Sequence, residues 1–172
     1  MTLGRTASAI AAATRMPLKD VLANCENSWK AELTEDPQSK ELYPNQTPRE
    51  VFGHFVEVKP DPLPDPYIVA VSPAMAAELS LDLGEAQGET FIRLFSGDTS
   101  AVADASVRPW ATPYAVSVFG QPITAPDPFG RGNGYGDGRA LSLFECLVSA
   151  DESAGQSMTS RRWELQLKGA VR

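Results

Sequence analysis

The sequence predicts an α+β fold in which short helices precede an antiparallel sheet. From Trp110 onward, strand-forming apolar segments are joined by stretches of turn-forming residues, which is typical of antiparallel strands. Before Trp110, apolar residues recur at spacings of three and four, which places them on one face of a helix. The sequence has no strand–helix–strand unit with a glycine-rich helix start, which argues against a Rossmann domain.

The composition indicates one globular domain with an acidic surface. The chain has 172 residues, of which 42% are hydrophobic and 22% are charged, and its formal net charge is -7. Nonspecific binding to nucleic acid or to anionic lipid needs a surplus of Lys and Arg. The apolar runs, such as Tyr67 to Val71, are far shorter than the roughly 20 residues that span a bilayer. We therefore expect no nucleic-acid partner and no insertion into a membrane.

The N-terminal segment has the composition of a targeting sequence. Residues 1–19 contain Arg5, Arg15 and Lys19 but no acidic side chain, which resembles a mitochondrial or plastid transit peptide. An alanine-rich N-terminal helix is the alternative. We expect a mitochondrial location, with plastid and cytoplasm as alternatives. The rest of the chain divides into a region of helices and an extended strap, 20–109, and a strand-rich region, 110–172.

Three helices are predicted before the strand-rich region. Apolar spacings of three and four predict one amphipathic helix from Leu18 to Leu33. Ser72 followed by Pro73 is typical of a helix start, so a helix is expected over Ala74 to Leu79. A third helix is expected over Glu89 to Phe95.

The predicted strands are separated by an extended strap. Alternating prolines from Pro60 to Pro66 exclude a helix or a central strand. Strands are predicted over Tyr67 to Ser72, Tyr114 to Gly120, Ala140 to Val148 and Trp163 to Gly169. In the last of these, a period of two puts Leu167 on an apolar face and directs Lys168 toward a polar site.

The sequence offers little for thiol, zinc or triad chemistry. Cys25 and Cys146 are far apart in the sequence with no second thiol near either, which is typical of small buried side chains in a reducing compartment. A nucleophile or a metal ligand is the less favoured interpretation. Because His54 is the sole histidine, neither a common zinc site nor a Ser/His/Asp triad is expected.

A glycine-rich segment, Gly130 to Gly138, suggests phosphate binding. Glycines let backbone N–H groups approach a polyphosphate without obstruction by a Cβ, and nearby Arg and Lys side chains add positive charge. Arg139, directly after the glycines, and Lys168 on the later strand are the cations that could bind the same anion.

Two other interpretations of the glycine-rich segment remain. It can be a tight hairpin with Asp137 and Gly138 at its tip. It can also be a calcium loop, although such repeats need several stacked copies and one occurs here. A Walker A loop is excluded because no Gly-Lys-Ser/Thr follows the glycines.

Several separated motifs resemble one family when they are taken in order. They are Asn27-Ser28, Phe55 to Pro60, Ile68 to Pro73, Trp110 to Tyr114, Gly134 to Ala140, Glu145, and Trp163 to Gly169. Together they resemble the N-terminal portion of the selenoprotein O family.

This resemblance implies a partial protein-kinase-like fold with an antiparallel-sheet small lobe. It implies binding of ATP in an inverted orientation and transfer of AMP to hydroxyl side chains of proteins, the partners of the full-length parent. Gly136, Gly138 and Arg139 match the family's Gly-Asp-Gly-Arg turn, and Lys168 matches its third-strand lysine.

The chain departs from the family pattern in two places. Phe144 stands where many members have glycine before Glu145. After Lys168, the family continues into a catalytic base and magnesium ligands, which we expect beyond Arg172. We therefore expect an N-terminal fragment with half of the ATP site that is inactive alone. The alternatives are a non-catalytic interaction or regulatory module, related to a pseudokinase, and an incomplete gene model.

Overall fold

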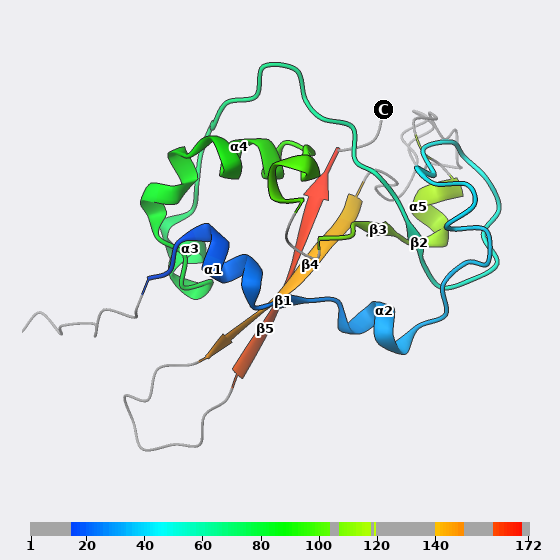
Figure 1. Cartoon of the computed structure of the whole chain (residues 1–172), viewed down its shortest axis with the longest axis horizontal. Coiled ribbons are helices and arrows are strands. Elements are labelled where there is room, and N and C mark those ends of the chain that lie inside the picture. Colours follow the sequence, from blue (N-terminus) through cyan, green and yellow to red (C-terminus); the bar gives the residue numbers. More distant parts are fainter. Residues whose placement is uncertain (1–14, 104–106, 118, 120–139, 150–159, 170–172) are drawn as a thin grey trace, which may run out of the picture.

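The computed structural model describes residues 15–103, 107–117, 119, 140–149 and 160–169 (Figure 1). It is a mixed α/β structure with a curled antiparallel sheet of five strands. The α-helices are α1 (Leu18–Ala23), α2 (Ser28–Glu32), α3 (Pro73–Glu78), α4 (Glu89–Phe95) and α5 (Pro113–Ser117), and the 3-10 helices are η1 (Leu83–Gln87) and η2 (Thr99–Val102). The strands are β1 (Cys25–Glu26), β2 (Val56–Glu57), β3 (Trp110–Ala111), β4 (Ala140–Ser149) and β5 (Ser160–Lys168).

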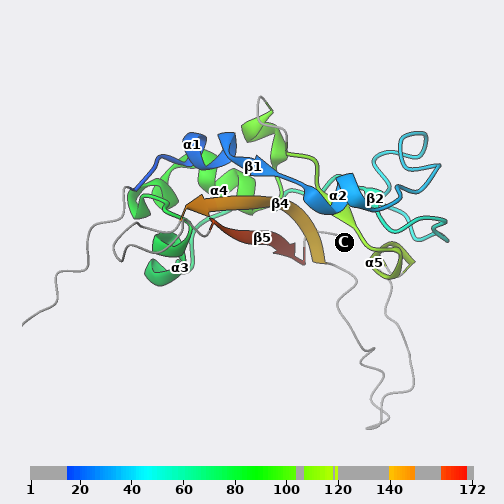
Figure 2. The same ribbon diagram turned by 90° about the horizontal axis from the view of Figure 1, so that it is seen from below.

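Strand β4 is the centre of the sheet. It pairs with β5 along its whole length and with the two short strands β1 and β3 on its other edge, and β3 in turn pairs with β2. A register shift between Ser142 and Phe144 interrupts the β4–β5 ladder, and β4 bends along its length in Figure 2. The sheet therefore draws its strands from both sides of residue 110.

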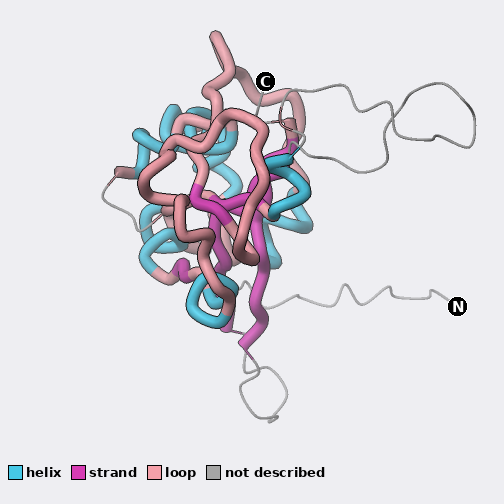
Figure 3. Tube along the Cα trace, turned by 90° about the vertical axis from the view of Figure 1, so that its right-hand side faces the viewer, coloured by secondary structure: helices cyan, strands magenta, loops and turns pink. Residues whose placement is uncertain are grey.

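The hydrophobic core joins β4 to the helices that surround it. Leu141, Leu143 and Phe144 of β4 are fully buried, as is Leu94 of α4. Leu18 and its neighbours in α1 belong to the same buried cluster. In Figure 3 the end of the β4–β5 ribbon that leads to residues 150–159 extends beyond the surrounding helices and loops. The core therefore includes side chains of β4 from Leu141 to Val148.

The loop between α2 and β2 is organised by a buried carboxylate. Asp36 is 2% exposed and accepts hydrogen bonds from the backbone N–H groups of Gln38 (2.8 Å) and Phe52 (2.7 Å). The guanidinium of Arg49 lies 3.1 Å from the same side chain and also donates to Asn45 at 3.0 Å. These bonds hold a long segment without regular secondary structure in one conformation.

Several sequence predictions are confirmed. The antiparallel pairing and the strands β4 and β5 occur where the apolar pattern placed them. Helix α3 begins after Ser72, whose hydroxyl accepts the N–H of Met75 at 3.2 Å, and α4 covers the predicted residues. The proline strap has neither helix nor strand. The predicted targeting segment lies outside the described residues, except for 15–19.

The single helix predicted from Leu18 to Leu33 is wrong. Helix α1 ends at Ala23, the chain becomes extended at Cys25–Glu26, and α2 begins at Ser28. The reason is that Cys25 and Glu26 pair with Cys146 and Glu145 of β4. Backbone hydrogen bonding to a distant strand overrides the local helical spacing.

Two predicted strands are also wrong. Tyr67 to Ser72 makes no strand pairing among the described residues, and Tyr67 and Val69 are 77% and 84% exposed. Without a neighbouring strand, its β-forming residues do not form a ladder. Where a strand was predicted from Tyr114, the chain forms α5, because Thr112 caps the N–H of Ala115 (3.2 Å) and Pro113 suits a first helical turn.

Candidate functional site

The β4–β5 pair has an apolar face and a polar face. Residues paired across the two strands share a face, so Ala140 lies with Lys168, and Ser142 lies with Gln166. Leu167 is buried on the other face, whereas Gln166 and Lys168 are exposed. We call the face that carries Ala140, Ser142, Glu145, Arg162, Glu164, Gln166 and Lys168 the polar face. The prediction that Leu167 and Lys168 lie on opposite faces of the strand is confirmed.

Lys168 lies beside the strand residue that follows the glycine-rich segment. Its register partner is Ala140, the first residue of β4, and Arg139 precedes Ala140 in the sequence. Gly136, Gly138 and Arg139 lie outside the described residues, so their placement and the role of Lys168 stay predictions. The register brings the end of β5 to the start of β4.

A small pocket lies at this end of the ribbon. It has a volume of about 190 Å³, and it is lined by Gln166, Lys168 and Gly169 of the β5 end together with Leu63 and Ser96. The proline strap therefore contributes to the surroundings of Lys168. Sequence reasoning did not connect these two segments.

Glu145 is a buried carboxylate on the polar face. It is 3% exposed, and its Oε2 accepts the backbone N–H of Ser28 at 2.5 Å. Arg162 of β5 lies 3.7 Å from the same oxygen and forms an ion pair with Glu26 at 2.7 Å. Glu145 therefore ties the start of α2 to the central strand.

Ser142 is a residue that sequence reasoning missed. Its side chain is buried, and its hydroxyl makes no hydrogen bond among the described residues. It lies two positions after Ala140 on the same face, so about 7 Å from it along the strand. The strand period was the signal that could have identified it. An unpaired buried hydroxyl is available to hydrogen bond with a ligand or a water molecule.

The two cysteines lie side by side, whereas the histidine lies on the surface. Cys25 and Cys146, which the sequence treats as isolated, lie with their Sγ atoms 3.4 Å apart, and Cys146 is buried. His54 is exposed, and its Nδ1 accepts the N–H of Thr34 at 3.1 Å.

Within the part of the chain that the structure describes, no group of three or more His, Cys, Asp or Glu side chains could hold a metal ion. None of the described helices is long and apolar enough to cross a membrane.

Comparison with known proteins finds relatives that are named protein nucleotidyltransferase YdiU. A protein nucleotidyltransferase YdiU of Aromatoleum aromaticum is 33% identical over 147 residues, which cover 84% of this chain and 24% of that protein. The YdiU protein of Tolumonas auensis is 36% identical over 146 residues, covering 84% of this chain and 23% of the relative. That of Xanthomonas oryzae pv. oryzae is 34% identical over 122 residues, or 71% of this chain and 20% of the relative.

These relatives agree with the family that the sequence motifs resemble. The chain belongs to the YdiU family of protein nucleotidyltransferases, which is the selenoprotein O family. It spans about a quarter of the length of the first two relatives. No protein-family model matches the chain, and no solved structure matches it.

Proposed function

We propose that the start of β4 and the end of β5 bind the phosphates of ATP in a protein that transfers AMP to protein hydroxyl groups. The observation that carries the proposal is the pairing of Lys168 with Ala140, the residue that follows Arg139. The identity to proteins named protein nucleotidyltransferase supports the reaction class.

The chemistry suits a phosphate site. Lys168 and Arg139 are cations in a chain whose net charge is -7, and Lys168 is exposed and paired with Ala140, the residue that follows Arg139 in the sequence. Gly136 and Gly138 leave backbone N–H groups unobstructed by a Cβ. Such donors neutralise the charge that develops on the phosphates when the α-phosphorus is attacked. Protein kinases combine a glycine-rich hairpin and a strand lysine in the same way, which supports a kinase-like small lobe.

We propose that magnesium and the catalytic base are held by residues outside the region described. The described residues bring no three acidic, histidine or cysteine side chains into a metal-binding group. A magnesium ion bound with ATP would neutralise phosphate charge. By itself, the 172-residue chain is then expected to bind ATP weakly and to transfer no AMP.

Calorimetry with ATP tests the site directly. Lys168→Ala and Arg139→Ala should each weaken binding about tenfold, because each removes a charge-assisted hydrogen bond to phosphate. Lys40→Ala is the matched control, since Lys40 is exposed in the loop before β2. Equal affinities in all four proteins would contradict the assignment of the site.

A transfer assay tests the reaction in a longer protein. In a full-length YdiU relative, replacing the residues that align with Arg139 and Lys168 should abolish labelling of a protein acceptor by ATP labelled in its α-phosphate. Unchanged labelling would contradict their role. Strong labelling by the 172-residue chain alone would contradict its expected inactivity.

A non-catalytic interaction module is the second candidate. The exposed side chains of Tyr67 and Val69 favour it, because a partner could cover them. In that case calorimetry should show no binding of ATP to the chain. Measurable binding that Arg139→Ala removes favours the nucleotide site instead.

We also propose that residues 1–19 direct the protein to mitochondria. Their basic, acid-free composition supports this proposal. A fusion of residues 1–19 to a fluorescent protein should accumulate in mitochondria. A fusion that stays in the cytoplasm or enters plastids would overturn it.

A further inference from the structure

Two cysteines that are distant in the sequence are direct neighbours across the sheet. Cys25 of β1 and Cys146 of β4 are register partners in an antiparallel pair, and their Sγ atoms are 3.4 Å apart. Their separation in the sequence is 121 residues. Cys25 Sγ also lies 3.2 Å from the carbonyl oxygen of Val21, to which the thiol can donate. The pairing of β1 with β4 therefore creates a dithiol.

We propose that Cys25 and Cys146 are a redox modification site, which a hydroperoxide converts reversibly into a disulfide that links β1 to the central strand. This site is separate from the polar face and does not depend on the proposed function. Its formation would connect the N-terminal segment covalently to the strand that begins after Arg139.

The backbone geometry of the pair suits a disulfide. Directly paired residues of antiparallel strands have Cα atoms about 4.5 or 5.5 Å apart, and disulfides span about 4.4–6.8 Å between Cα atoms. The two Sγ atoms at 3.4 Å must come within about 2.05 Å of each other. Rotation of the two side chains can supply this movement without a change of strand register.

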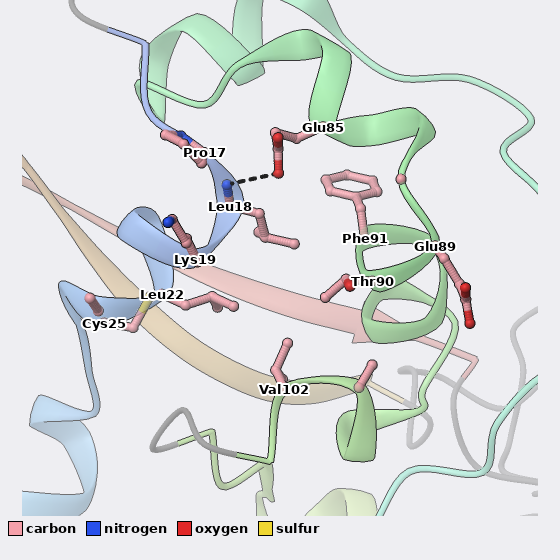
Figure 4. Close-up of a pocket in the computed structure, with 13 residues that line it drawn as sticks. Pro17, Leu18, Lys19, Leu22, Cys25, Glu85, Glu89, Thr90, Phe91 and Val102 are labelled. Atoms are coloured by element: carbon pink, nitrogen blue, oxygen red, sulfur yellow. Dashed lines mark hydrogen bonds between the residues drawn. The ribbon is translucent and has the colours of Figure 1, made fainter.

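One thiol is reachable and the other is sheltered. Cys25 lines a pocket of about 740 Å³ between α1, η1, α4 and η2, together with Leu22, Lys19 and Phe91 (Figure 4). Cys146 is 1% exposed. A small oxidant can therefore reach Cys25 through the pocket, whereas Cys146 is placed to react with Cys25.

The contact between the sulfurs also separates their proton affinities. The hydrogen bond to Cys146, with burial as a second cause, raises the pKa of Cys25 above its ordinary value. The same hydrogen bond lowers the pKa of Cys146, although burial opposes this shift. When the pair loses its first proton, Cys146 therefore becomes the thiolate and Cys25 keeps its proton.

The proposed reaction balances in two steps. Cys25 passes its proton to Cys146 and attacks the O–O bond of hydrogen peroxide as the thiolate, which gives a sulfenic acid and a hydroxide; the hydroxide takes the proton back from Cys146 and leaves as one water molecule. The Cys146 thiolate then attacks the Cys25 sulfur, the S–S bond forms as the S–O bond breaks, and the departing hydroxide takes up a proton as a second water. Two thiols lose two electrons and two protons, and the peroxide is reduced.

Mass spectrometry of the peroxide-treated chain tests the proposal. The 172-residue chain should lose the mass of two hydrogen atoms and yield one disulfide-linked peptide pair containing Cys25 and Cys146, and dithiothreitol should reverse both changes. Cys25→Ser and Cys146→Ser are matched controls that should form no intramolecular bond. Oxidation of the unsubstituted 172-residue chain only to sulfinic acid, or only to intermolecular disulfides, would overturn the proposal.

A rate comparison keeps the test decisive if a variant fails to fold. Because the fold holds the thiols together, disulfide formation in buffer should be at least about tenfold faster than in concentrated urea. Equal rates in the two solvents would show that the native contact does not promote the reaction.

The oxidised chain should also melt about 5–10 °C higher than the reduced chain, since the bond closes a long loop. An unchanged or lower melting temperature would count against the proposed link between β1 and β4.

Discussion

The carboxylate of Glu145 accepts a hydrogen bond from the backbone N–H of Ser28, at 2.5 Å. The two residues are 117 positions apart, and both belong to motifs that resemble the selenoprotein O family. Strand β1 (Cys25–Glu26) pairs with β4 beside this bond, because Glu26 is the register partner of Glu145. The family resemblance in these two motifs therefore corresponds to one structural unit, in which the start of α2 is tied to the central strand.

Replacing Glu145 should destabilise the protein because its carboxylate is buried. Glu145→Ala leaves the N–H of Ser28 without its acceptor, so we expect the free energy of unfolding to fall by about 1–3 kcal/mol. Urea denaturation followed by circular dichroism measures this change. Glu164→Ala is the matched control, because Glu164 is the exposed register partner of Glu145, and its effect should stay within about 0.5 kcal/mol. Equal effects of the two substitutions would contradict this account.

Gly53 should tolerate no side chain. A Cβ at this position would lie 2.5 Å from the backbone nitrogen of Asp36, and backbone atoms have little freedom to move away. Gly53→Ala should lower the free energy of unfolding by about 1–3 kcal/mol, which thermal melting can detect. Gly84→Ala is the control, since its nearest neighbour is the Asp82 side chain at 3.4 Å. A Gly53→Ala protein as stable as the Gly84→Ala protein would refute the close contact.

The carboxylate of Asp36 should make stability depend on pH. Burial by itself raises the pKa of Asp36, but hydrogen bonds from Arg49 and from the N–H groups of Phe52 and Gln38 outweigh it and hold the pKa below its ordinary value. A lowered pKa in the folded state gives stability that is complete above the unfolded pKa, about 3.9, and is lost as the pH falls through the folded pKa.

Asp36→Asn isolates this contribution. The variant should be less stable than the parent at pH 7, because the amide replaces an ionised acceptor beside Arg49. The difference between the two proteins should shrink as the pH falls below about 4, since the unfolded parent then binds a proton at Asp36 that the folded parent binds only at lower pH. Urea denaturation at several pH values provides the comparison. A difference that is constant from pH 7 to pH 2 would show that Asp36 does not titrate as described.

Ser72 should contribute to stability as the cap of α3. Its hydroxyl accepts the N–H of Met75 at 3.2 Å, at a position where the helix has no other acceptor for that donor. Ser72→Ala should cost about 1 kcal/mol of unfolding free energy, whereas Ser72→Asp should retain most of it. Chemical denaturation of the three proteins measures both changes. An equal loss of unfolding free energy in the Ala and Asp variants would mean that the hydrogen bond to Met75 does not stabilise α3.

Local patterns in the sequence were enough to predict the elements whose determinants lie within a few residues. The Ser72-Pro73 pair predicted the start of α3, because capping and a first-turn proline act on the adjacent backbone. The alternation ending at Leu167 and Lys168 predicted β5 and its two faces, because a strand exposes alternate residues whatever it pairs with. The motifs likewise predicted the family that the relatives confirm.

The tertiary structure decided the features that depend on distant partners. The helical spacing after Leu18 gave no sign that Cys25 and Glu26 would leave the helix and pair with β4. For the same reason, Cys25 and Cys146 were predicted from the sequence to be separate thiols, although their sulfurs lie 3.4 Å apart. A periodic pattern records only which side of its own segment is apolar, whereas strand pairing depends on which backbone edge the rest of the chain brings alongside.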